Sequence, residues 1–150
     1  MKKFDTKNYE RYKRDVLASQ PKEKPYNEYT RDELIIRFMP LVENLARKFP
    51  TAQTSSGILT VEDFIGFGHI GLIKSVDKVD YETLNKSEDQ EKTIKSFFSK
   101  RIKGAIRRAI DKYKGDIRIP EHKLNEIRKD AGKDKKLLSI LFNSMFLSID

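Results

Sequence analysis

The stretch that decides the fold is IKSFFSKRIKGAIRRAIDKY (94–113), which separates on a helical wheel into an apolar face and a basic face. Its apolar residues recur every three or four positions, which predicts a single stripe packed against a core. These residues are Phe98, Ile102, Ala105, Ile106, Ala109 and Tyr113. The cations lie roughly opposite this stripe or on one flank of it: Lys100, Lys103, Arg107 and Lys114, then Arg101, Arg108 and Lys112.

Phe97 lies off this stripe, in the gap between the two basic rows, where packing against a core does not explain it. An aromatic ring among cations can stack on an unpaired base while the cations hold phosphates. The plainer interpretation of a basic helix is a solvated charged face. The position of Phe97 favours nucleic acid.

The net charge of the chain is concentrated around this helix. Residues 94–129 contain twelve Lys or Arg and four acids, a net charge of +8, and the whole chain also carries +8. The remaining residues therefore sum to zero. Such a concentration of positive charge is typical of a surface that binds a polyanion.

Composition narrows the class of protein. A length of 150 residues suits one domain with tails, and the absence of Cys excludes disulfides and thiolate metal sites and fits a reducing cytoplasm. No apolar run is long enough for a membrane span. Neither a phosphate-cradling glycine loop nor a nucleophile motif is present, and His69 and His122 do not form a metal motif. We therefore expect a cytoplasmic protein that is not an enzyme and has no cofactor.

The periodicity predicts an all-α fold, a compact helical bundle, in three parts. Residues 1–30 are expected to be a flexible N-terminal segment because Pro21 and Pro25 interrupt it, although 8–18 can form a short helix. Residues 31–122 form the helical domain, and 123–150 form a basic and apolar tail. The segment 81–94 is expected to be an exposed loop.

Two capping boxes mark helix starts within the domain. Thr30 with Glu33 opens one helix, which either kinks at Pro40 or restarts there, and Thr60 with Asp63 opens another that runs to about residue 79. Glycines at 68 and 71 inside the second helix cost stability, which indicates close packing against another helix.

Four segments follow one another in a characteristic order between Asp32 and His122. They are PLVENLARKF (40–49), FIGFGHIGLIKSVDKVD (64–80), IKGAIRRAI (102–110) and IRIPEH (117–122). Together they resemble the second region of bacterial sigma factors of the sigma-seventy family. The resemblance implies a helical bundle that docks on the clamp helices of the largest subunit of core RNA polymerase. It also implies binding of the minus-ten element of promoter DNA, partly as flipped-out bases of the non-template strand.

The resemblance places polymerase binding on the helix after Thr60. The matching residues are Asp63, Gly66, Phe67, His69 and Ile73. The family usually has a polar Gln-Glu pair where this chain has Gly66 and Phe67, so docking here is expected to be more apolar.

The resemblance places promoter binding on the basic helix and the residues after it. The expected DNA contacts are Lys95, Phe97, Phe98, Lys100, Arg101, Lys103, Gly104, Arg107, Arg108, Arg118 and His122. Phe97 matches a base-capturing tyrosine of the family. Lys100 and Arg101 replace the paired tryptophans that wedge the duplex, so melting is expected to depend on supercoiling or on an activator.

Only 28 residues follow His122, which suggests a minimal sigma factor without a domain that reads the minus-thirty-five element. Minimal layouts of this kind resemble the late-gene sigma factors of bacterial viruses, which would act in the host cytoplasm. The apolar tail is either a helix packed on the bundle or a docking segment for polymerase or an accessory activator. The residues that would carry the docking are Leu137, Leu138, Leu141, Phe142 and Phe146.

Two other functions remain open. A basic DNA- or RNA-binding module that never contacts polymerase would explain the charge but not the segment 61–80. A small nucleic-acid-processing enzyme would need clustered carboxylates or histidines, which the sequence does not offer.

Overall fold

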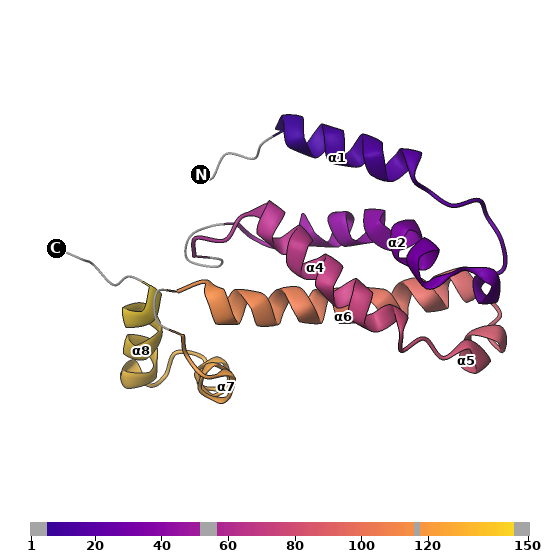
Figure 1. The fold of residues 1–150 in the computed structure, drawn as a ribbon. Coiled ribbons are helices and arrows are strands. Elements are labelled where there is room, and N and C mark those ends of the chain that lie inside the picture. Colours follow the sequence, from indigo (N-terminus) through magenta and orange to yellow (C-terminus); the bar gives the residue numbers. More distant parts are fainter. Residues whose placement is uncertain (1–5, 52–56, 116–117, 146–150) are drawn as a thin grey trace.

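The computed structural model describes residues 6–51, 57–115 and 118–145, with side chains described as far as Ile140 (Figure 1). Three helices form the centre of the fold: α2 (Arg31–Ala46), α4 (Val61–Val76) and α6 (Gln90–Tyr113). α4 packs against both of the others, and its contact with α6 is the most extensive. The described residues contain helices and no strand, which confirms the predicted all-α bundle.

Both predicted capping boxes are present. The Thr30 hydroxyl accepts from the Glu33 backbone N–H at 3.3 Å, and the Thr30 N–H donates to the Glu33 carboxylate at 2.9 Å. Thr60 and Asp63 make the same reciprocal pair at the start of α4. Pro40 lies inside α2, which continues through it as one helix. Each box satisfies N–H groups that the first helical turn leaves without partners.

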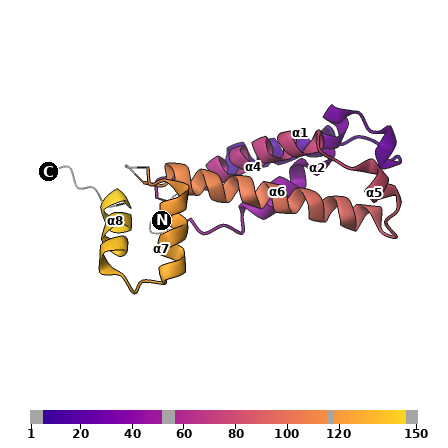
Figure 2. The same cartoon turned by 90° about the horizontal axis from the view of Figure 1, so that it is seen from below.

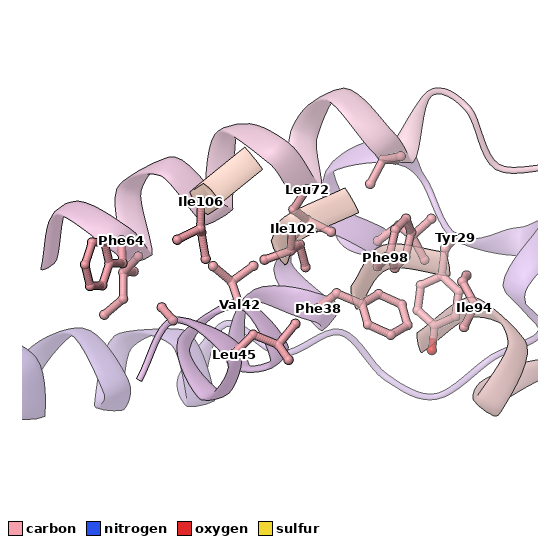
Figure 3. Packing of buried hydrophobic residues seen from close by; sticks show 14 of the residues in the cluster. Tyr29, Phe38, Val42, Leu45, Phe64, Leu72, Ile94, Phe98, Ile102 and Ile106 are labelled. Carbon is pink, nitrogen blue, oxygen red and sulfur yellow. The ribbon is translucent and has the colours of Figure 1, made fainter. Parts of the chain in front are cut away.

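The core lies where the apolar stripes of these three helices meet (Figure 3). α6 contributes the residues that its periodicity predicted, and Phe98, Ile102 and Ile106 are fully buried. Phe38 of α2 meets Phe98 edge-on, with ring centroids 4.8 Å apart. Tyr113 is an exception to the predicted stripe because it is 45% exposed.

The N-terminal region differs from the flexible segment expected over residues 1–30. α1 (Thr6–Ala18) runs along the outer side of α2 (Figure 1). After it, Tyr26 in the short helix η1 (Tyr26–Glu28) and Tyr29 are both buried in the core. Pro21 and Pro25 lie between α1 and η1, as expected of residues that interrupt helices. The connection is nevertheless packed on the core, because the two tyrosines bury apolar surface there.

The segment 81–94 is not the exposed loop that its polar composition suggested. It contains α5 (Tyr81–Asn85) and the first turn of α6. Asp80 caps α5, and the Asp89 carboxylate accepts from the Lys92 N–H at 2.9 Å to begin α6. Ile94 is 1% exposed, so this end of α6 is held by the core as well as by its cap.

The chain after α6 forms a helical hairpin of α7 (Glu121–Asp130) and α8 (Lys135–Met145), which lie side by side at the end of α6 (Figure 2). The predicted boundary at residue 122 therefore falls inside α7. An ion pair between Arg128 and Asp111 at 2.5 Å joins α7 to α6. No helix in the described part of the chain is long and apolar enough to cross a membrane.

Candidate nucleic-acid interface

A groove of about 560 Å³ runs between α4 and α6 on the surface of the bundle. The two helices are in close contact at small residues, where a Cβ on Gly71 would come within 2.6 Å of the Ala105 Cβ. The floor of the groove includes Gly71 and Ala105, and its two banks carry aromatic and basic side chains. These are Phe67, Ile70 and Lys74 from α4, Lys78 from the turn after it, and Phe97, Lys100, Arg101, Gly104 and Arg108 from α6.

The groove is strongly positive. No carboxylate is among its lining residues. Five cations line it: Lys74, Lys78, Lys100, Arg101 and Arg108. Within the described ranges none of these five forms an ion pair, whereas Lys95, which lies just before the groove on α6, is paired with Glu91. Unpaired cations with an apolar floor suit a ligand that carries both phosphates and flat rings.

Phe97 lies in the wall of this groove and is half-buried. Its ring packs against Phe98, with centroids 5.5 Å apart, and the Arg101 guanidinium carbon lies 4.6 Å from its centroid. The expected position off the main stripe is therefore correct, although the ring also packs on the edge of the core. A base that reaches this point either displaces Arg101 or stacks on its guanidinium plane.

The structure divides the predicted DNA contacts into groups. Five of them meet in the groove: Phe97, Lys100, Arg101, Gly104 and Arg108. Lys95, Lys103 and Arg107 lie outside it, and the Arg107 guanidinium lies 6.0 Å from the centroid of the Phe49 ring. Any nucleic-acid contact by these three would involve another face of α6.

Phe98 requires a correction. It was predicted as a DNA contact as well as a core residue, but its side chain is 0% exposed and packs against Phe38. The helical period explains the outcome, because Phe98 falls on the same stripe as Ile94 and Ile102. In this fold Phe98 supports Phe97 from below and is not available to DNA.

The predicted contacts beyond α6 lie near its C-terminal end. Arg118 is exposed and lines a small hollow together with Arg108 and Asp111. His122 is exposed on the first turn of α7. Arg118 therefore extends the positive surface beyond the groove, whereas His122 belongs to the helical hairpin.

The residues predicted to bind polymerase do not form one surface. Asp63, Gly66 and Ile73 lie on an exposed ridge of α4, where a Cβ on Gly66 would meet open space and Ile73 is 39% exposed. Ile70, which sequence reasoning missed, is 50% exposed on the same side of the helix. We call Gly66, Ile70 and Ile73 the α4 ridge.

Phe67 faces the groove instead of the ridge. Its ring stacks on Tyr113 with centroids 5.5 Å apart and planes 5° from parallel, which leaves it half-buried. A docking role for Phe67 predicts that its ring is exposed in the free protein, and the ring is only partly exposed because it stacks on Tyr113 of α6. The sequence could not identify this pair, because it depends on how α4 and α6 are aligned.

His69 lies on the opposite side of α4 from the groove, under α1. The Tyr12 hydroxyl is hydrogen-bonded to His69 Nε2 at 2.9 Å, and their ring centroids are 5.9 Å apart. Burial lowers the pKa of His69 and raises the pKa of Tyr12 to about 12. A protonated phenol facing a neutral imidazole is the hydrogen-bonded arrangement that these directions favour.

Sequence reasoning also missed Lys74 and Lys78, which place positive charge on the α4 bank of the groove. Lys74 lies in the last turn of α4 and Lys78 in the turn that follows it, so only the packing of α4 on α6 brings both lysines to the groove. Among the described residues no group of His, Cys, Asp or Glu could hold a metal ion.

In the predicted tail, Leu137 and Leu138 are half-buried in the α7–α8 hairpin. The side chains of Leu141 and Phe142, and the whole of Phe146, lie outside the described residues. No model of a known protein family matches the chain.

Proposed function

We propose that this protein is a minimal sigma factor that docks on core RNA polymerase and directs it to the minus-ten element of promoters. The observation that carries the proposal is the groove between α4 and α6, in which Phe97 lies among five cations and no lining carboxylate. Lys and Arg neutralise phosphates, and an aromatic ring stacks on an unpaired base. The proposed role is non-enzymatic.

The division of labour follows from the faces of the two helices. The groove would hold the non-template strand, with Phe97 as the base-stacking residue and Arg101 and Arg108 at its phosphates. The α4 ridge would contact the clamp helices of the largest polymerase subunit, because it is apolar and exposed and shares only Ile70 with the lining of the groove. Promoter DNA and polymerase could then be bound at the same time.

A second candidate is a basic DNA- or RNA-binding module that never contacts polymerase. The same groove favours it, because the charge and the aromatic ring would bind nucleic acid without any partner protein. The two candidates differ in the α4 ridge, which has no role in the second.

The deciding experiment combines a binding titration with selection of DNA. Labelled protein is titrated with bacterial core RNA polymerase, and the complex is used to select sequences from a random DNA library. We expect saturable binding and one enriched sequence element that is protected in footprinting. Lys48 and Lys86 are exposed and lie outside the groove, so Lys48→Ala with Lys86→Ala is a charge-matched control for Arg101→Ala with Arg108→Ala.

Loss of selection in the arginine variant, with core binding retained, would support the proposed assignment of the groove. Selection of DNA by the protein alone, with no binding to core polymerase, would instead establish the polymerase-independent module. Failure to bind either nucleic acid or polymerase would reject both candidates.

A further inference from the structure

α1 buries little apolar surface against the described part of the bundle. Val16 is the buried residue of this helix, while its neighbour Leu17 is 60% exposed. The Arg47 guanidinium lies 4.0 Å from the centroid of the Tyr9 ring, and Tyr12 reaches His69. By contrast, α2, α4 and α6 each bury several large apolar side chains. Segments with little buried apolar surface open at lower free energy than the core.

The contact between Tyr12 and His69 is where α1 reaches α4. These residues are 57 positions apart, and the hydrogen bond between them is part-buried. His69 adjoins the α4 ridge, because residues 66, 69 and 73 follow one another at three- and four-residue spacing. α1 therefore covers one edge of the surface proposed to bind polymerase and leaves Ile70 and Ile73 exposed.

The connection after α1 would keep its own anchors if α1 moved. The Gln20 side-chain amide donates to the Ile36 carbonyl at 2.8 Å. Farther along, the Tyr26 ring stacks on Phe38 with centroids 6.4 Å apart, and Lys24 pairs with Glu33 at 2.6 Å. The Gln20 amide also donates to the Val16 carbonyl of α1 at 3.3 Å, but Lys24 and Tyr26 fix the chain to α2 without any contact to α1. A hinge at the end of α1 would therefore leave the core intact.

We propose that α1 is a displaceable cover on the polymerase-binding surface of α4, and that core RNA polymerase binds the form in which α1 has moved away from His69. The inference rests on the proposed function. In the closed form Tyr12 occupies His69, and in the open form His69 joins Gly66 and Ile73 in one continuous surface. Core polymerase and α1 compete for this edge of α4.

Competition has a measurable consequence. If only the open fraction binds, the apparent dissociation constant equals the intrinsic one divided by that fraction. A substitution that opens α1 must then tighten binding without adding any contact to polymerase. Val16→Asp puts a charge at the buried position of α1, and Leu17→Asp puts the same charge at the exposed neighbouring position as a matched control.

The test measures amide hydrogen exchange and affinity for core RNA polymerase in the full-length chain. We expect Val16→Asp to speed exchange in α1 without changing α2, α4 or α6, and to tighten core binding at least about threefold relative to Leu17→Asp. In the wild-type complex, α1 amides should exchange faster than in the free protein. Tyr12→Phe keeps the ring and removes the hydroxyl, so it should act in the same direction more weakly. If Val16→Asp disturbs the packing of the bundle, the affinity of Tyr12→Phe for core polymerase still tests the proposal.

Three outcomes would overturn the inference. If Val16→Asp and Tyr12→Phe bind core polymerase no more tightly than Leu17→Asp while wild type binds well, the proposed function stands and the cover is rejected. Protection of α1 that persists in the wild-type complex rejects the cover in the same way. Absence of core binding by wild type and every variant rejects the proposed function and the inference with it.

Discussion

Gly71 of α4 lies so close to Ala105 of α6 that a methyl group on Gly71 would come within 2.6 Å of the Ala105 Cβ. The backbone carbonyl of Arg101 would be 3.4 Å from the same methyl group. This approach brings the two helices together at the floor of the groove. The separation of its basic banks therefore depends on the absence of a side chain at position 71.

Gly71→Ala should destabilise the fold and disturb the groove. Alanine gains about 1 kcal/mol in helix propensity, but overpacking costs typically about 1–3 kcal/mol, and neither a neighbouring Cβ nor a backbone carbonyl can rotate away. We expect a net loss of about 1 kcal/mol in the free energy of unfolding, measured in urea. Gly66→Ala is the control, because a Cβ at Gly66 meets open space, and it should stabilise the protein by about 0.5–1 kcal/mol. Equal stabilisation by both substitutions would contradict this packing.

Close packing at Gly71 was predictable because a glycine inside a strong helical pattern needs a packing reason. The capping boxes and the core stripe of α6 were predictable for a similar reason, since each depends on residues a few positions apart. The stacking of Phe67 on Tyr113 and the position of Tyr12 over His69 depend on how distant helices are aligned. No local pattern specifies those contacts, which is why Phe67, Tyr113 and the N-terminal segment differ from expectation.

Phe97→Ala should weaken binding of an unpaired strand. Stacking of a base on an aromatic ring contributes about 1–3 kcal/mol, so the population of open promoter complexes should fall by about tenfold or more. Phe97→Leu is a matched control for packing, since it keeps an apolar side chain against Phe98 but removes the flat ring. Permanganate reactivity of promoter thymines, on supercoiled and linear DNA, reports the opening.

If stacking of a base on the Phe97 ring is responsible, Phe97→Leu should reduce promoter opening almost as much as Phe97→Ala does. Normal opening by Phe97→Leu would mean that the ring acts by packing alone. The resemblance to sigma factors puts Lys100 and Arg101 at the positions of wedging tryptophans, so under the proposed function we also expect wild type to open supercoiled DNA more readily than linear DNA.

Arg101→Ala with Arg108→Ala should reduce the salt dependence of DNA binding. Each lost phosphate contact lowers the slope of log affinity against log salt by about 0.7 for a single strand. The double variant should therefore lose about 1.4 from the slope for a single-stranded oligonucleotide, measured by fluorescence anisotropy. Lys48→Ala with Lys86→Ala removes the same charge away from the groove and should leave the slope nearly unchanged. Equal slopes for the two pairs would show that the groove arginines face solvent in the complex.

Ile73→Asp should weaken binding to core RNA polymerase. Ile73 is 39% exposed on the α4 ridge, so a carboxylate there costs little in folding but would be buried unpaired in a docked complex. We expect a loss of about 1–3 kcal/mol in binding free energy, with a change in unfolding free energy of less than about 0.5 kcal/mol. Ile58→Asp is the control, since Ile58 is 75% exposed and precedes α4. Unaltered core affinity for Ile73→Asp would remove the ridge from the docking surface.

Stability at mildly acidic pH should depend on His69. Burial lowers its pKa from the usual 6.5, so the unfolded chain takes up a proton at a higher pH than the folded protein does. The stability that neutral His69 contributes is therefore fully present above about pH 6.5 and is lost as pH falls through its lower folded-state pKa. Glu43 acts in the opposite sense, because burial raises its pKa and protonation favours its folded form.

His69→Gln separates these two effects, since glutamine does not titrate and its amide can still meet the Tyr12 hydroxyl. Urea unfolding between pH 8 and pH 5 should show wild type losing stability relative to His69→Gln, with the difference growing below about pH 6.5. Amide exchange in α1 should accelerate over the same range in wild type, because a charged imidazole is disfavoured in the half-buried contact beneath Tyr12. Parallel pH profiles for the two proteins would mean that His69 is as well solvated in the folded protein as in the unfolded chain, and that α1 does not cover it in solution.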